Sequence, residues 1–158
     1  MESNLINYVR LEFDNRTTER LFDYCRINKL GLLDSEDESS PVSSEDYKFH
    51  ITVMYSKVAH PKFVDGEYDV YPFSLKPDVL QMFGPNHDIL AIKLKQEKLF
   101  SNLFEYYEDS YGHVSDFPCN PHVSIRGSNA GYKDRLPNIP LPDFNLVVNR
   151  LIHKVKEA

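Results

Sequence analysis

The stretch FHITVMYS, residues 49–56, combines the pattern of a buried strand with two reactive side chains. Phe, Ile, Val, Met and Tyr dominate it, as expected for a strand of the hydrophobic core. Successive side chains of a strand point to opposite faces, so His50 and Thr52 share the face opposite to Ile51. The stretch therefore predicts a strand that buries one face and presents an imidazole and a hydroxyl on the other.

The same pattern returns late in the chain, in PHVSIRG, residues 121–127. Alternation there places His122, Ser124 and Arg126 on one face and Val123 on the other. Two such strands lying side by side would form a single site with two histidines.

The other histidines form no recognisable site. His113 and Ser115 make a third triplet of the same kind, but it follows Gly112 and lacks apolar alternation, so we expect it in a solvent-exposed loop.

Four side chains of the chain are of the types that bind zinc, yet they fall at no recognised ligand spacing, and we expect no metal. They are His50, His60, Cys119 and His122.

The rest of the chain predicts further strands and two helices, in an α+β domain over residues 1–158 made of two similar halves. The first helix would begin near a cap at Asp14, Thr17 or Thr18 and end at Gly31, and the second would end at Gly112. An acidic, Ser-rich loop at about 34–46 is either a surface linker or a lid. The predicted strands are residues 7–13, 49–56, 67–77, 78–84, 88–95, 121–127 and 144–155, and the helices are 14–33 and 96–112.

Composition narrows the class of protein. The chain has no apolar run of about 20 residues and no secretory signal, so we expect a cytoplasmic protein without a membrane segment. A formal net charge of −6 disfavours binding to long DNA or RNA, but a local donor cluster can still bind a small anion. Cys25 and Cys119 are too few for a disulfide framework and are expected to be reduced thiols.

Two imidazoles in one site suit the cleavage of a phosphodiester without a metal or another cofactor. One removes a proton from the attacking hydroxyl while the other donates a proton to the leaving oxygen, each contributing about 10²–10⁴-fold. The hydroxyls of Thr52 and Ser124 can hold the non-bridging phosphate oxygens, and Arg126 can add a charge-assisted donor.

The paired strands resemble those of the 2H phosphoesterases, which are named for two H-x-[ST] motifs. The resemblance covers nearly the whole chain and is carried by FHITVMYSK, by DFPCNPHVSIRG after the second helix, and by the separation of the two histidines. It implies a bilobal fold of two pseudo-symmetric βαββ-type halves, with antiparallel sheets around a central cleft, and a metal-independent reaction. It also implies an acid–base pair and two phosphate-binding hydroxyls, namely His50 with His122 and Thr52 with Ser124.

Within that superfamily, HITVMYSK, FGPNHDILAIKL and the Pro-rich approach to the second motif look like the small phage anti-CBASS nucleases. Those enzymes degrade cyclic di- and trinucleotide signals of bacterial immunity. The resemblance implies that a 2′-hydroxyl attacks a 3′–5′ linkage and gives a linear product through a 2′,3′-cyclic phosphate, in the cytoplasm of the host cell. The preferred nucleotide and the oligomeric state stay open, and so does the question of which histidine is the general base.

Aromatic side chains are the expected contacts for the bases of such a ligand, because stacking contributes about 1–3 kcal/mol per base. Tyr8, on the polar face of the first strand, is the preferred platform, with Phe117 and Tyr132 as lesser candidates. The last strand departs from the family pattern. Its polar side chains could contact substrate or form a solvated end of the chain: His153, Lys154 and Glu157.

Two other functions remain open at this point. One is a 2H enzyme that acts on 2′,5′-oligonucleotides or on RNA ends with a 2′,3′-cyclic phosphate. The other is a binding protein that sequesters a cyclic nucleotide without cleaving it, although such a protein has no need of an acid–base pair.

Overall fold

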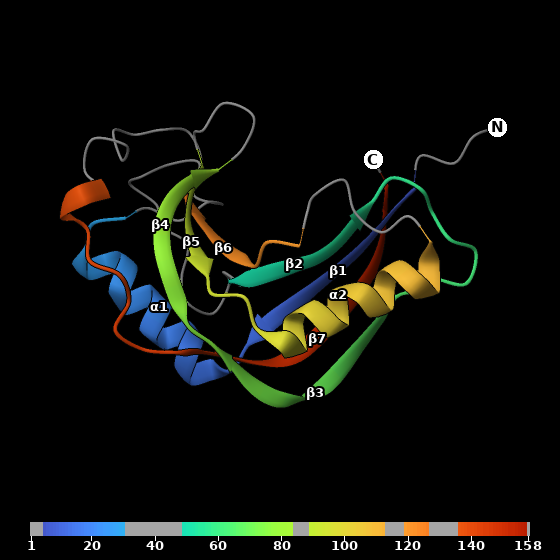
Figure 1. Ribbon diagram of the computed structural model, residues 1–158, viewed down its shortest axis with the longest axis horizontal. Coiled ribbons are helices and arrows are strands. Elements are labelled where there is room, and N and C mark those ends of the chain that lie inside the picture. The colour runs from blue at the N-terminus through green and yellow to red at the C-terminus, as the bar shows by residue number, and fades with distance from the viewer. Residues whose placement is uncertain (1–4, 31–48, 84–88, 113–118, 127–135, 158) are drawn as a thin grey trace.

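The computed structural model describes residues 5–30, 49–83, 89–112, 119–126 and 136–157. Strands and helices both occur, in two antiparallel sheets with two α-helices, so the predicted α+β class is confirmed (Figure 1). The described elements, in chain order, are β1 (Leu5–Phe13), α1 (Asn15–Ile27), β2 (His50–Ser56), β3 (Gly66–Leu75), β4 (Pro77–Phe83), β5 (Ile89–Leu94), α2 (Lys98–Tyr111), β6 (His122–Arg126), the 3-10 helix η1 (Leu136–Asn138) and β7 (Leu146–Glu157).

The first sheet combines strands from both ends of the chain. Its order is β2-β1-β7-β3, and the second sheet has the order β4-β5-β6. The last strand, β7, is antiparallel to both β1 and β3 and lies between them. As a result β1 is an interior strand, whereas β2 and β6 each lie at the edge of a sheet.

The first helix begins as predicted but ends early. The Asp14 carboxylate accepts the N–H of Thr17 at 2.8 Å, which makes Asp14 the N-cap. At the other end the Asn28 side chain donates to the Tyr24 carbonyl, and Lys29 takes a positive φ of 55°. These contacts satisfy the last carbonyls before Gly31 is reached, so the predicted stop at Gly31 is wrong.

The second helix ends at Gly112 as predicted, and the reason is conformational. Gly112 has a φ of 76°, a left-handed conformation that favours glycine, and its N–H donates to the Glu108 carbonyl. Neither helix in the described part of the chain has the length and apolar character that crossing a membrane requires.

A single hydrophobic core joins both sheets and both helices. Its fully buried side chains come from the strands and from α1 and α2, and include Leu11, Leu21, Ile51, Leu90, Ile92, Phe100, Tyr107 and Ile125. Both cysteines are free thiols, as predicted, and burial raises the pKa of Cys25 to about 12. The shared core holds the two sheets together at the strands that carry the histidine motifs.

Candidate functional site

The two strands predicted to carry the histidine motifs, β2 and β6, lie against each other across the two sheets (Figure 1). Each begins with its motif histidine, His50 in β2 and His122 in β6. Within the described residues the two strands belong to different sheets and share no β-ladder. Residues that are far apart in the sequence are thereby placed along one junction between the sheets.

Burial confirms the alternation predicted for both motifs. Ile51 and Val53 are no more than 1% exposed, while His50 and Thr52 are half-buried. In β6 the same holds for His122 and Ser124, which alternate with fully buried Val123 and Ile125. Each motif therefore has a core face and a second, partly accessible face that carries an imidazole and a hydroxyl.

Both motif strands contain an irregularity directly after the motif hydroxyl. In β2, Thr52 pairs with Arg10 and Met54 with Val9, so that Val53 is an extra residue. In β6, Ser124 pairs with Ala91 and Arg126 with Leu90, so that Ile125 is extra in the same way. Such β-bulges bend a strand and re-aim its side chains, and they are frequent next to active sites.

The bulge in β6 affects the expectation for Arg126. Its main chain pairs with Leu90, and the register shift between Leu90 and Ala91 interrupts the strict alternation by which Arg126 was expected to share a face with His122. The side chain of Arg126 lies outside the described residues, as do Phe117, Tyr132 and His113.

A main-chain hydrogen bond orients the ring of His122. Its Nδ1 atom lies 2.8 Å from the carbonyl oxygen of Asn120. A carbonyl only accepts, so Nδ1 carries the proton and Nε2 is the acceptor of the neutral ring. His122 can therefore take up a proton at Nε2 and, once charged, donate it from the same atom.

The central strand β1 supplies the neighbours of the first motif. In register, Glu12 lies opposite His50, and Arg10 lies opposite Thr52. Because β1 is an interior strand, its polar face is largely enclosed: Glu12 is only 7% exposed and Tyr8 only 6%. The predicted polar face thus becomes a buried layer beside the motif.

An ion pair and a ring contact occur within this layer. The Nε of Arg10 donates to a carboxylate oxygen of Glu12 at 2.9 Å. Burial, the largest effect, raises the pKa of the Tyr8 hydroxyl. The rings of Tyr8 and His50 meet edge to face with centroids 6.3 Å apart.

Tyr8 is less open to a base than the stacking prediction requires. The Nζ of Lys156 lies 4.4 Å from the centroid of the Tyr8 ring, and the Cζ of Arg10 lies 6.0 Å from it. Both positions fit cation–π contacts. With these cations beside a side chain that is only 6% exposed, the role of Tyr8 as a platform stays a prediction.

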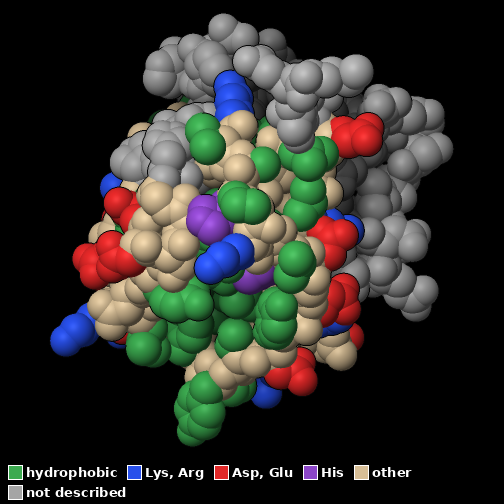
Figure 2. Space-filling view, turned by 90° about the vertical axis from the view of Figure 1, so that its right-hand side faces the viewer, with side chains coloured by type: hydrophobic (Ala, Val, Ile, Leu, Met, Phe, Trp, Pro, Cys, Tyr) green, Lys and Arg blue, Asp and Glu red, His purple; other side chains and the backbone are tan. Residues whose placement is uncertain are grey.

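Basic side chains gather around the motifs although the chain as a whole is acidic. Lys93 pairs in register with His122, and Lys154 pairs with Tyr8. Sequence reasoning missed Lys93, although alternation along β5 places it on the same face as Ala91 and opposite fully buried Ile92. Figure 2 shows one face of the molecule on which histidine and basic side chains lie near the centre, and acidic side chains lie mainly toward the edges.

His153, a possible substrate contact by sequence, occupies a different environment. It pairs in register with Val9, whereas the next residue, Lys154, pairs with Tyr8. Successive side chains of β7 point to opposite faces, so His153 lies on the face opposite to Lys154. Its ring stacks on Phe63 with centroids 4.8 Å apart, and its Nε2 lies 2.5 Å from the hydroxyl of Tyr107. His153 is therefore a structural contact between β7 and α2, whereas Lys154 lies on the side of the motifs.

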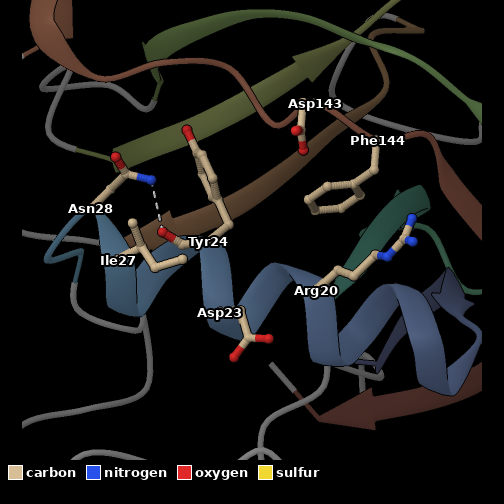
Figure 3. Close-up of a pocket in the computed structure, with 7 residues that line it drawn as sticks. All are labelled: Arg20, Asp23, Tyr24, Ile27, Asn28, Asp143 and Phe144. Carbon is tan, nitrogen blue, oxygen red and sulfur yellow. Dashed lines mark hydrogen bonds between the residues drawn. The ribbon is translucent and has the colours of Figure 1, made fainter.

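A separate pocket of about 400 Å³ lies between α1 and the segment before β7 (Figure 3). It contains none of the motif residues. Its lining consists of Arg20, Asp23, Tyr24, Ile27, Asn28, Asp143 and Phe144.

No group of three or more His, Cys, Asp or Glu side chains with the geometry to hold a metal ion occurs in the described ranges. No protein-family model matches the chain, and no curated protein matches it either. The candidate site therefore rests on the structure alone. Its features are the adjoining motif strands, the oriented ring of His122 and the basic side chains beside them.

Proposed function

We propose that the protein is a metal-independent phosphodiesterase of the 2H type that cleaves the 3′–5′ bonds of cyclic di- or trinucleotide immune signals. The observation that carries the proposal is the contact between β2 and β6, because each of these edge strands begins with an H-x-[ST] triplet. Two antiparallel sheets that meet at these strands are compatible with the bilobal arrangement of that superfamily. By destroying the signal in the host cytoplasm, the protein would block CBASS-type antiphage defence.

The proposed reaction needs one proton acceptor and one proton donor on opposite sides of a phosphorus atom. One imidazole removes the proton from the ribose 2′-hydroxyl, whose oxygen attacks the phosphorus, and the second gives a proton to the leaving 5′-oxygen. The product is a linear nucleotide with a 2′,3′-cyclic phosphate. His122 is suited to either role through Nε2, because Asn120 fixes its other nitrogen as a donor.

The phosphate would be held by hydroxyls and cations from both sheets. Thr52 and Ser124 supply neutral donors from the motif strands. Arg10 and Lys93 lie opposite Thr52 and His122 in the neighbouring strands and supply positive charge. Donors fixed in a partly enclosed site stabilise the charge that develops on the non-bridging oxygens better than donors in water do.

The test is to incubate the purified protein with substrate in the presence of EDTA and to analyse the products by mass spectrometry. The substrates are cyclic dinucleotides, cyclic trinucleotides, linear 2′–5′ oligoadenylates and RNA with a 2′,3′-cyclic phosphate end. We expect turnover of the cyclic 3′–5′ compounds, with a 2′,3′-cyclic phosphate as intermediate. Turnover of only the 2′–5′ compound or of the RNA end would assign another 2H specificity, and tight binding without turnover over hours would identify a sequestering protein.

A further inference from the structure

The last strand carries two lysines on the face of the sheet that bears the first histidine motif. Lys154 pairs in register with Tyr8, and residues directly opposite each other in an antiparallel ladder share a face. Lys156 follows two residues later, and its Nζ lies 4.4 Å from the centroid of the Tyr8 ring. The ring of His50 meets the same ring edge to face, with centroids 6.3 Å apart. Tyr8 thus contacts a motif imidazole and a lysine ammonium at the same time.

The arginines of this face already have counter-charges within the protein. Arg10 lies 2.9 Å from a carboxylate oxygen of Glu12, and Arg150 is paired with Glu67. The two charges of an ion pair nearly cancel at a distance, so a paired cation attracts a further anion less strongly than an unpaired one does. The charge of each arginine is therefore largely balanced by the protein itself.

Lys154 and Lys156 form no ion pair with any carboxylate in the described ranges. Asp65 reaches the strand between them, but its carboxylate accepts the main-chain N–H of Val155 at 2.6 Å. Both lysines are exposed, and charges of one sign gathered on one surface raise the local concentration of ligands of the opposite charge. The two ammonium groups are therefore available to an anion from outside the protein.

The place of these lysines in the sheet indicates which charge of a ligand they would meet. In the proposed reaction the scissile phosphate lies between His50 and His122, where β2 adjoins β6. Strand β1 separates β7 from β2, so the main chain of β7 is two strand spacings away, about 10 Å. The lysines thus lie to one side of the scissile bond, beyond Tyr8. A cyclic dinucleotide carries a second phosphodiester charge, on the other side of its ring.

We infer that Lys154 and Lys156 form a second anion subsite, which binds the phosphodiester group that is not cleaved. This inference rests on the proposed function and deepens it, because it requires a substrate with at least two phosphodiester charges. It also divides the basic side chains by role. Lys93, beside His122, serves the scissile phosphate, and the two lysines of β7 serve the other one.

The test compares two ligands that differ by one charge. One is cyclic di-AMP or cyclic di-GMP, and the other is the same compound with one of its two phosphodiesters replaced by a neutral methylphosphonate. Dissociation constants are measured in a His122→Ala background, which prevents turnover. We expect the double variant Lys154→Gln/Lys156→Gln to weaken binding of the dianionic ligand about tenfold, the size expected for two charged contacts at the protein surface. Binding of the monoanionic analogue should change less than about twofold.

Two further double variants serve as controls. Lys29→Gln/Lys98→Gln removes the same amount of charge from exposed positions at the ends of the two helices and should leave both dissociation constants unchanged. Lys154→Arg/Lys156→Arg keeps the charge and should retain the preference for the dianionic ligand. If both Gln variants weaken binding equally, the effect is one of net charge, and the subsite is overturned.

Two other results would overturn the subsite without affecting the proposed function. If Lys154→Gln/Lys156→Gln leaves binding of the dianionic ligand unchanged, the lysines contact no phosphate. If it weakens binding of both ligands equally, the lysines act on the scissile phosphate and not on the second one. In both cases the wild type still cleaves the cyclic dinucleotide. If neither cyclic dinucleotide binds or is cleaved, the subsite and the proposed function fail together.

Discussion

The Nε2 atom of His153 and the hydroxyl of Tyr107 lie 2.5 Å apart and join the last strand to the second helix. Phe63, in the segment between β2 and β3, stacks on the same imidazole. The main chain of Val64 also lies beside this imidazole. One imidazole thus holds three parts of the chain together, on the opposite side of the sheet from the candidate site.

This arrangement predicts that stability depends on pH through His153. Burial lowers its pKa from the ordinary value of 6.5, and the hydrogen bond to Val64 opposes this shift only in part. Below pH 6.5 the unfolded chain binds a proton before the folded protein does, so the free energy of unfolding falls as the pH falls through this range. At pH values well above 6.5 His153 is neutral in both states and contributes no further dependence.

The measurement is urea unfolding of the wild type and of His153→Phe between about pH 5 and pH 8. Phe keeps an aromatic ring against Phe63 but cannot titrate. Carboxylates and other histidines titrate in both proteins, so the relevant quantity is the difference between the two curves. We expect this difference to change with pH below 6.5, and a constant difference would contradict the prediction.

The two motif histidines should be jointly required for activity. We expect His50→Ala and His122→Ala each to lower kcat by about 10²–10⁴-fold, because each removes one of the two proton transfers. The double variant should be little worse than the poorer single variant, since the two groups act as a unit. His113→Ala is the matched control with the same triplet, and a loss of equal size there would contradict the assignment.

Lys93 should contribute to substrate binding. Its strand neighbour is His122, so its charge lies near the expected phosphate. We expect Lys93→Gln to raise KM about three- to tenfold and to weaken the dependence of KM on salt. Lys98→Gln removes an exposed charge at the start of α2 and should leave KM unchanged, and equal effects of the two changes would contradict a local role for Lys93.

Glu12 should stabilise the fold. Its side chain is 9% exposed and is the shared partner of Arg10 and Arg150. We expect Glu12→Gln to lower the free energy of unfolding by about 1–3 kcal/mol, because it leaves the largely enclosed guanidinium of Arg10 without its counter-charge, whereas Arg150 keeps its pair with Glu67. Asp23→Asn breaks an exposed pair with Arg26 and should cost less than about 0.5 kcal/mol. Similar losses in the two variants, measured by urea unfolding, would contradict a special role for Glu12.

The sequence predicted the features that depend on neighbouring residues. The faces of His50 with Thr52 and of His122 with Ser124 follow from the period of a strand, and the cap at Asp14 follows from local hydrogen bonding. The sequence could not predict features that depend on a distant partner. The bulges at Val53 and Ile125 are visible only against the paired strands, and so is the position of Lys93 beside His122.

The sequence could not predict the enclosure of β1 either, for the same reason. Its alternating pattern is typical of a strand with one polar face, and the sequence does not say what covers that face. The insertion of β7 between β1 and β3 makes β1 an interior strand and brings Lys156 over the ring of Tyr8. Tyr8 therefore could be placed on the correct face while its surroundings could not be foreseen.

The absence of a β-ladder between β2 and β6 in the described chain has a consequence for adaptation. Strands within a sheet are fixed at about 4.8 Å by their hydrogen bonds, whereas strands of separate sheets are spaced by the interior side chains that pack between them. Conservative exchanges in that interior can therefore widen or narrow the separation of the two strands while both sheets stay intact. Ligands with smaller or larger rings would come within reach by gradual repacking, with the histidines themselves untouched.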